Sequence, residues 1–103
     1  MKKIINGKTY NTETAKLIGE WSTSGICTGD FRYCEEGLYL SRKGQYFLAG
    51  SGGALTQYGV SCGNNCTAGS SNIKLLSKEE AREWAEYHLS ADEYLNVFEE
   101  IEG

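Results

Sequence analysis

Four cysteines are the residues best suited to chemistry in this chain of 103 residues. They form two local pairs, Cys27 with Cys34 and Cys62 with Cys66, and 27 residues lie between the pairs. Four thiolates are a common ligand set for a tetrahedral structural Zn²⁺ site, with sulfur at about 2.3 Å from the metal. Since both pairs lie in loop-like stretches, the interpretation that we favour is one structural zinc site that uses all four sulfur atoms.

Two other states of these sulfur atoms stay open. The cysteines are also compatible with free thiols, or with one or two disulfides in an oxidising environment. Six residues separate Cys27 from Cys34, which is longer than the two to four residues typical of zinc motifs. A catalytic zinc site is not indicated, because no second histidine and no carboxylate is positioned by spacing to complete it.

The remaining polar motifs do not indicate catalysis. His88 is the single histidine, and we interpret it as a partly buried residue near a helix end. A nucleophile, a base and an orienting group need more partners than one histidine supplies. The Gly-Ser-Gly-Gly run at 50–53 lacks the lysine and the spacing of a phosphate-binding loop. We therefore expect a protein that acts by binding and is not an enzyme, with a thiol enzyme as the weakest alternative.

The acidic charge is concentrated at the C-terminal end of the chain. The formal net charge is −4, but residues 77–103 carry nine Asp or Glu and only two Lys or Arg. Such a segment disfavours direct nucleic-acid binding, which needs positive charge to neutralise phosphates, and it suits a basic protein surface. A solvated helix surface is the simpler alternative. The candidate contact residues are Glu79, Glu83, Glu86, Asp92, Glu93, Glu99 and Glu100.

The length and hydropathy of the chain restrict its class. A chain of this size is expected to form a single domain over residues 1–103, and we expect a monomer. No apolar run reaches the roughly 18 residues of a transmembrane helix. The N-terminal residues turn polar too early for a secretory signal. We therefore expect a cytoplasmic protein without a membrane contact.

The β-strand signals predict an antiparallel sheet of about four to five strands. An Asn-Gly pair, which favours a type I′ turn, predicts a hairpin over residues 2–10. Alternation of apolar and polar residues predicts a strand over 14–22. Aromatic and aliphatic residues on both sides of a Lys-Gly turn predict a second hairpin over 37–50. A short apolar run predicts a last strand over 73–76.

Between these strands, glycine-rich stretches predict loops. The run at 50–53 is expected to be a loop or bulge, where glycine allows positive φ or close approach of another segment. Residues 59–72 are rich in Gly, Ser, Asn and Thr and contain two of the cysteines. Loops of this length are uncommon in compact domains unless they are tethered or functional. We expect this one to be tethered through its cysteines.

Two capping boxes predict two C-terminal helices. Ser77 with Glu80 begins a predicted helix over 77–89, and Ser90 with Glu93 begins a second over 90–101. Apolar residues recur at helical spacing in both stretches. The predicted fold is therefore α+β, with two C-terminal helices packed on the antiparallel sheet and zinc-stabilised loops at one end of it.

Three stretches in order carry a family resemblance: residues 6–15, residues 38–53 with Tyr58, and residues 76–98. Together they resemble a group of small proteins carried by phages and mobile elements of Gram-positive bacteria, which includes type II-A anti-CRISPR proteins. The resemblance covers about two thirds of the chain, and its motifs look structural and not catalytic. The cysteine-containing loops depart from the commoner pattern of this group.

The resemblance implies a stoichiometric inhibitor that binds Cas9 or its guide-RNA complex in the cytoplasm of a bacterial host. Cas9 holds nucleic acid in positively charged channels, so an acidic protein surface could block DNA loading or cleavage there. The alternative function is a zinc-stabilised adaptor or regulatory protein of a phage or mobile element, with another protein as its partner.

Overall fold

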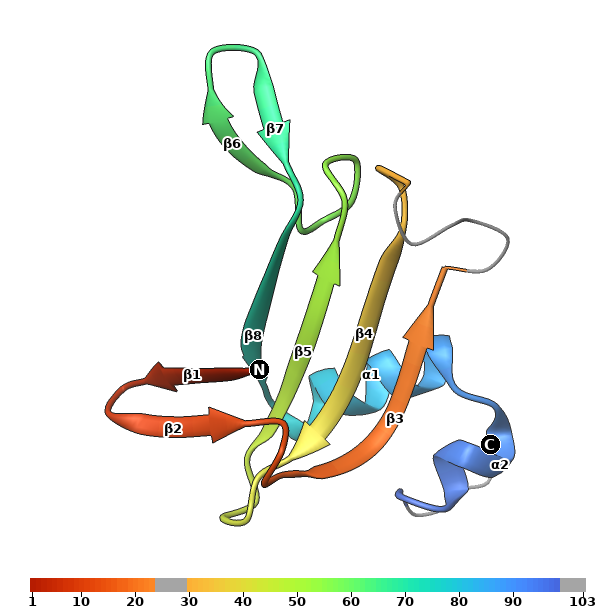
Figure 1. The fold of residues 1–103 in the computed structure, drawn as a ribbon. Coiled ribbons are helices and arrows are strands. Elements are labelled where there is room, and N and C mark those ends of the chain that lie inside the picture. Colours follow the sequence, from red (N-terminus) through yellow and green to blue (C-terminus); the bar gives the residue numbers. More distant parts are fainter. Residues whose placement is uncertain (24–29, 99–103) are drawn as a thin grey trace.

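A four-stranded antiparallel sheet, in the order β3-β4-β5-β8, forms the centre of the molecule (Figure 1). The structure, a computed structural model, describes residues 1–23 and 30–98. Two further hairpins, β1-β2 and β6-β7, and two helices complete the described part of the chain. The elements are β1 Lys2–Ile5, β2 Lys8–Asn11, β3 Lys16–Ser22, β4 Cys34–Leu40, β5 Tyr46–Gly52, β6 Val60–Gly63, β7 Cys66–Ala68, β8 Ser70–Leu76, α1 Lys78–His88 and α2 Ala91–Leu95.

The N-terminal hairpin is confirmed, with the predicted turn between β1 and β2. Asn6 has φ 53° and Gly7 has φ 77°, which are the two positive values that a type I′ turn requires. The Nζ atom of Lys3 donates a hydrogen bond to the Oδ1 atom of Asn72 on β8 at 2.7 Å. The hairpin is thereby connected to an edge strand of the central sheet.

The two central strands are longer than the sequence predicted. β4 and β5 pair in register from Leu40 and Tyr46 at the turn to Cys34 and Gly52 at the far end. The prediction of a loop or bulge at 50–53 was therefore wrong for its first three residues, which belong to β5. The expectation of close approach was right, because a Cβ atom on Gly50 would collide with the Tyr58 hydroxyl.

The long loop predicted over 59–72 is also largely ordered as strands. β6 and β7 form a small antiparallel hairpin, and β8 already begins at Ser70. Polar composition hid both features, because a strand exposed on both faces lacks the alternation of apolar residues that marks a half-buried strand. Every residue of β6 and β7 is exposed, and the hairpin projects beyond the end of the sheet (Figure 1).

Both capping boxes are present at the predicted helix starts. The side chains of Ser77 and Ser90 accept from the backbone N–H of Glu80 and Glu93, and each glutamate accepts from the backbone N–H of its serine. α1 matches its predicted range within one residue. α2 ends at Leu95, well before the predicted end at residue 101, although residues 99–103 lie outside the described part.

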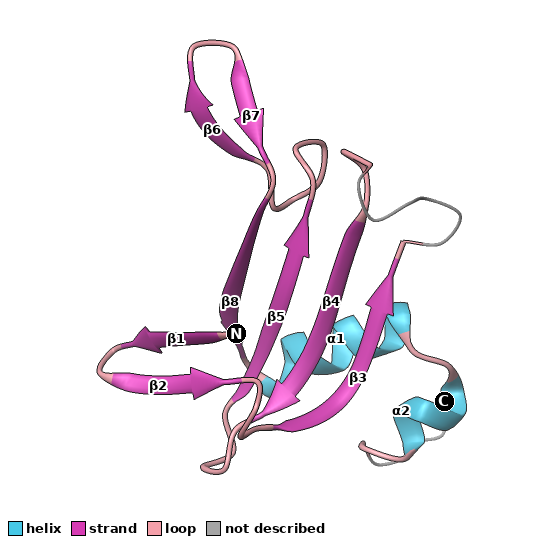
Figure 2. Cartoon of the chain, viewed as in Figure 1, coloured by secondary structure: helices cyan, strands magenta, loops and turns pink. Residues whose placement is uncertain are grey.

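Two apolar clusters cover opposite faces of the sheet. On one face, Leu38 and Leu48 of the central strands pack with Ala81 and Ala85 of α1 and with Phe98. On the other face, a tyrosine of the β1-β2 hairpin packs on the central strands. Figure 2 shows this hairpin on the side of the sheet that faces away from the helices. That second cluster consists of Tyr10, Phe47, Ala49 and Ile73. The α+β class, the antiparallel sheet and the two C-terminal helices are thus confirmed.

Candidate functional site

A buried glutamate lies where α1 meets the middle of the sheet. Glu36 is on β4, and alternation along the strand places it on the same face as Leu38, toward α1. It is 5% exposed and is the only charged residue in the buried set of the described chain. A buried carboxylate is costly unless it is hydrogen-bonded, so its hydrogen-bond partners must lie close by. The neighbours of Glu36 therefore define the candidate site.

Three neutral groups donate hydrogen bonds to the Glu36 carboxylate. The Tyr58 hydroxyl and the Gln57 side-chain amide donate to Oε2 at 2.6 and 2.5 Å. The indole Nε1–H of Trp84 donates to Oε1 at 3.2 Å. These donors come from the segment after β5 and from α1, so the carboxylate joins three parts of the chain. Among the described residues, these three neutral donors satisfy the buried carboxylate and no cation is hydrogen-bonded to it.

His88 is the fourth neighbour of this carboxylate. Its Nε2 atom lies 3.9 Å from Oε1 of Glu36, which is too long for a hydrogen bond. Its ring is surrounded by the rings of Trp21, Trp84 and Tyr87, at centroid distances of 4.3, 5.0 and 4.8 Å. Burial lowers the pKa of His88, and this effect outweighs the opposite influence of Glu36. The imidazole is therefore neutral at pH 7.

The Tyr58 side chain reaches Glu36 because glycine on β5 leaves room for it. The Tyr58 hydroxyl lies over Gly50, and Thr56 of the same segment lies over Gly52. A side chain at either glycine would collide with these residues, since its Cβ atom would lie closer to them than van der Waals contact allows. Burial raises the pKa of Tyr58, and the hydrogen bond to Glu36 raises it further, so the hydroxyl keeps its proton and donates it.

A pocket of about 550 Å³ opens beside this cluster, between α1 and the Gln57–Tyr58 segment. Its volume lies within the range of about 300–1,000 Å³ typical of ligand sites. Both aromatic and acidic side chains contribute to its lining. We call it the α1 pocket; it is lined by Glu36, Leu48, Gln57, Tyr58, Asn72, Lys74, Leu76, Glu80, Glu83, Trp84, Tyr87 and His88.

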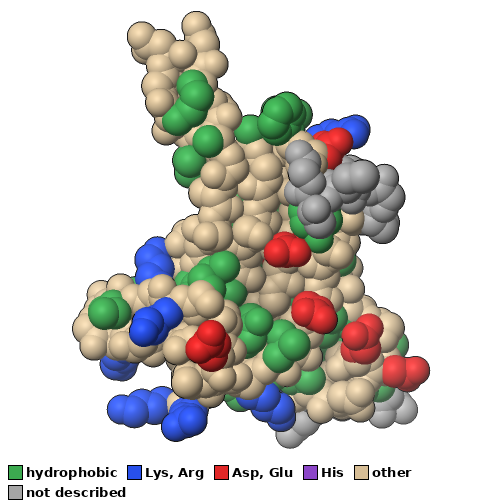
Figure 3. Space-filling view, in the orientation of Figure 1, with side chains coloured by type: hydrophobic (Ala, Val, Ile, Leu, Met, Phe, Trp, Pro, Cys, Tyr) green, Lys and Arg blue, Asp and Glu red, His purple; other side chains and the backbone are tan. Residues whose placement is uncertain are grey.

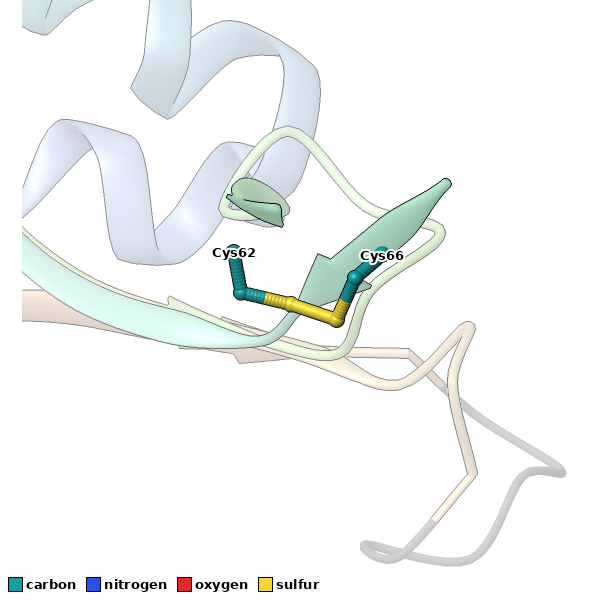
Figure 4. Close-up of a disulfide and its surroundings, with 2 residues drawn as sticks. All are labelled: Cys62 and Cys66. Atoms are coloured by element: carbon teal, nitrogen blue, oxygen red, sulfur yellow. A yellow bond between two sulfur atoms is a disulfide. The ribbon is translucent and has the colours of Figure 1, made fainter. Parts of the chain in front are cut away.

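The structure pairs two of the four cysteines with each other. Cys62 and Cys66 form a disulfide at the end of the β6-β7 hairpin, with their Cα atoms 5.2 Å apart (Figure 4). Cys34 is a free thiol, buried at the start of β4, and burial together with Glu36 raises its pKa. Cys27 lies outside the described residues.

This disulfide is one of the states that the sequence left open. Two sulfur atoms joined to each other cannot both serve as thiolate ligands, so the four-cysteine zinc site would need the reduced protein. Within residues 1–23 and 30–98 no group of three or more His, Cys, Asp or Glu side chains is arranged to hold a metal ion. The zinc site therefore stays a prediction, and the zinc content of reduced protein supplied with metal would test it.

Most of the predicted acidic contact residues lie together on the helical layer. Glu79, Glu83 and Glu86 are exposed along α1, and Asp92 and Glu93 are exposed at the start of α2. Glu99 and Glu100 lie outside the described residues. Two exposed apolar side chains accompany the acidic groups on these helices: Tyr87 is 85% exposed and Leu95 is 44% exposed.

The opposite face of the sheet carries a second shallow pocket. It lies between the β1-β2 hairpin and the far ends of the strands, and its volume is about 490 Å³. Glu35 accepts hydrogen bonds there from the hydroxyl groups of Tyr33 and Ser51 at 3.0 and 3.3 Å, and Glu20 lines the same pocket. Figure 3 shows acidic side chains on this face and basic ones around the hairpin and the lower turns.

Sequence reasoning missed the Glu36 cluster, whereas its interpretation of His88 as a partly buried residue near a helix end is confirmed. A glutamate next to the predicted 37–50 hairpin gave no signal of burial, because its donors lie 21, 22 and 48 residues away. The exposure of the acidic helix residues, by contrast, follows the expectation from their helical spacing.

Within the described residues, no helix has the length and apolar character needed to cross a membrane. Comparison of the chain with known proteins found no match to a protein-family model, to a curated protein or to a solved structure.

Proposed function

We propose that the protein is a stoichiometric inhibitor that binds type II-A Cas9, or its guide-RNA complex, through the acidic surface of α1 and α2. The observation that carries the proposal is the exposure of five acidic side chains on these two helices, which lie in one of the stretches that resemble the group of phage and mobile-element proteins that includes anti-CRISPR proteins. These residues are Glu79, Glu83, Glu86, Asp92 and Glu93.

The negative charge of this surface indicates the class of partner that it binds. Cas9 holds its heteroduplex in a positively charged channel, and an acidic protein surface is attracted to such a channel. Tyr87 and Leu95 add exposed apolar area among the carboxylates. Aromatic side chains are enriched at protein interfaces, whereas scattered acidic groups alone would give little affinity. A protein bound there competes with DNA for the channel and thereby inhibits cleavage without any turnover.

The test is DNA cleavage by a panel of type II-A Cas9 enzymes, each loaded with guide RNA and mixed with excess protein. We expect cleavage by at least one enzyme to fall. The double variant Glu79→Lys/Glu86→Lys should then need about tenfold more protein for the same inhibition, equivalent to about 1.4 kcal/mol of binding. Undiminished cleavage across the panel would contradict the proposal and favour the adaptor function.

A charge-matched control separates the helical surface from total charge. The double variant Glu13→Lys/Glu20→Lys makes the same change in net charge, but both residues are exposed away from the two helices. It should inhibit like the unchanged protein to within about twofold, because only long-range attraction is altered. Equal losses in the two variants would show that the helical surface is not the contact.

A further inference from the structure

We propose that the α1 pocket binds the guanidinium group of an arginine side chain that a basic partner presents. This inference rests on the proposed function and deepens it, since it assigns one contact of the acidic helical surface to a specific chemical group. It concerns the described residues Glu36, Tyr58, Glu83, Trp84 and Tyr87, all of which line the pocket.

The walls of the α1 pocket suit a planar cation. Trp84 and Tyr87 of α1 and Tyr58 of the opposite wall contribute aromatic rings, and Tyr87 is almost fully exposed at 85%. Cations bind over the faces of such rings, and arginine does so more often than lysine. Its planar guanidinium stacks on a ring and still donates hydrogen bonds in the plane, so it can use rings and carboxylates together.

The charge that lines the pocket is negative. Glu36 contributes a carboxylate from the buried side, and Glu80 and Glu83 contribute carboxylates from the exposed first turns of α1. Lys74 on β8 is the one ammonium group in the lining, so carboxylates outnumber it. His88 adds no charge at pH 7, because burial lowers its pKa. The pocket therefore favours a cationic occupant over an anion.

Glu36 has one acceptor position that the three donors described above do not use. An ionised carboxylate has about four acceptor sites, and three are used by Tyr58, Gln57 and Trp84. The arginine of the same helix is turned elsewhere, since the Arg82 guanidinium lies over the Phe98 ring at 5.7 Å. Within the described residues, then, a carboxylate that is only 5% exposed receives hydrogen bonds from neutral donors alone.

The direct test uses a matched pair of small probes on the full chain. N-acetyl-arginine N-methylamide carries the guanidinium, and the corresponding citrulline compound replaces it with an uncharged group of nearly the same shape. The indole N–H signal of Trp84 is followed by NMR during titration. We expect the arginine probe to shift this signal in a saturable way, and the citrulline probe to bind at least about fivefold more weakly, because it lacks the charge.

Three variants at exposed positions locate the binding without threatening the fold. Glu83→Gln and Tyr87→Ala each remove one pocket group and should weaken the arginine probe about threefold or more. Glu86→Gln is the matched control, since Glu86 is exposed on the same helix but does not line the pocket. Equal binding of both probes, or equal affinities of Glu83→Gln and Glu86→Gln, would overturn the proposal.

These outcomes are separable from the fate of the proposed function. Arginine binding with the expected variant pattern, in a protein that inhibits no Cas9, would support the pocket and reject the proposed partner. Inhibition of Cas9 that Tyr87→Ala and Glu83→Gln leave unchanged, with no Trp84 shift by the arginine probe, would reject the pocket and keep the proposed partner.

Discussion

The Glu36 cluster and the β6-β7 hairpin are held together in opposite ways. Glu36 is buried, and its three donors lie 21 to 48 residues away in the sequence. The hairpin is exposed at every residue, and its covalent link joins two cysteines only four residues apart. One region therefore depends on the whole tertiary structure, whereas the other depends on local covalent chemistry.

This difference determines whether a substitution affects the stability of the whole domain or of one hairpin only. Gln57 and Tyr58 lie in the segment after β5 and Trp84 lies on α1, so a change at Glu36 leaves polar groups in both places without a partner. The hairpin shares no core with the sheet, because two exposed strands bury no apolar side chain. We expect changes at Glu36 to affect global stability and changes at the disulfide to stay local.

Replacing Glu36 should give the largest effect. Glu36→Ala leaves the Trp84 indole and the Tyr58 hydroxyl without an acceptor in a buried site, and we expect a loss of about 2–4 kcal/mol in the free energy of unfolding. Urea denaturation measures this loss. The neighbouring Glu35→Ala, on the exposed face, should cost less than about 1 kcal/mol. Similar losses for both variants would show that Glu36 does not connect the elements.

Two tyrosine variants test the same difference between a partly buried and an exposed hydrogen bond. Tyr58 and Tyr33 each donate a hydrogen bond to a glutamate, at 2.6 and 3.0 Å, but the first bond is partly buried and the second is exposed. Tyr58→Phe should cost about 1–2 kcal/mol, because a carboxylate loses a donor in a partly buried site. Tyr33→Phe should cost under about 0.5 kcal/mol. A reversed order in denaturation measurements would contradict this assignment.

Acid should weaken the protein through His88. Because burial lowers the pKa of His88 in the folded state, the unfolded state takes up a proton first as the pH falls. Its contribution to stability is full above the ordinary value of 6.5 and is lost as the pH falls below it. Stability measured between about pH 7.5 and 5.5 should thus decrease. His88→Gln should flatten this dependence, and an unchanged slope would exclude His88 as its source.

Reducing the disulfide should have the smallest global effect. Without the Cys62–Cys66 bond, an isolated exposed hairpin is at best marginally stable, so its amide protons should exchange at least about tenfold faster. The free energy of unfolding of the sheet should change by less than about 1 kcal/mol, since the hairpin opens without the core. Hydrogen exchange and urea denaturation of Cys62→Ser/Cys66→Ser measure both quantities.

The opposite result would favour the zinc prediction. If the four cysteines clamp the loops through a metal ion, the same double variant should unfold the whole domain more easily and release the metal. Global destabilisation together with bound zinc in the reduced protein would show that the hairpin and the sheet are coupled, and the hairpin would then no longer be a purely local unit.

Local signals in the sequence determined a large part of the fold. The Asn6-Gly7 turn and the two serine caps act through neighbouring backbone groups, so their structures follow from a few adjacent residues. The acidic helical surface follows from helical spacing for the same reason. The sequence also predicted that cysteines tether the 59–72 stretch, and the structure joins Cys62 to Cys66 by a disulfide that lies entirely within this stretch.

Only the tertiary structure decided the site around Glu36. Glu35 and Glu36 are adjacent and chemically alike, yet the sheet exposes one and buries the other beneath α1. Which of them is buried depends on where α1 and the Tyr58 segment pack, and those contacts span tens of residues along the chain. A local pattern carries no information about such distant partners, and therefore the pocket became visible only when the sheet and the helix were brought together.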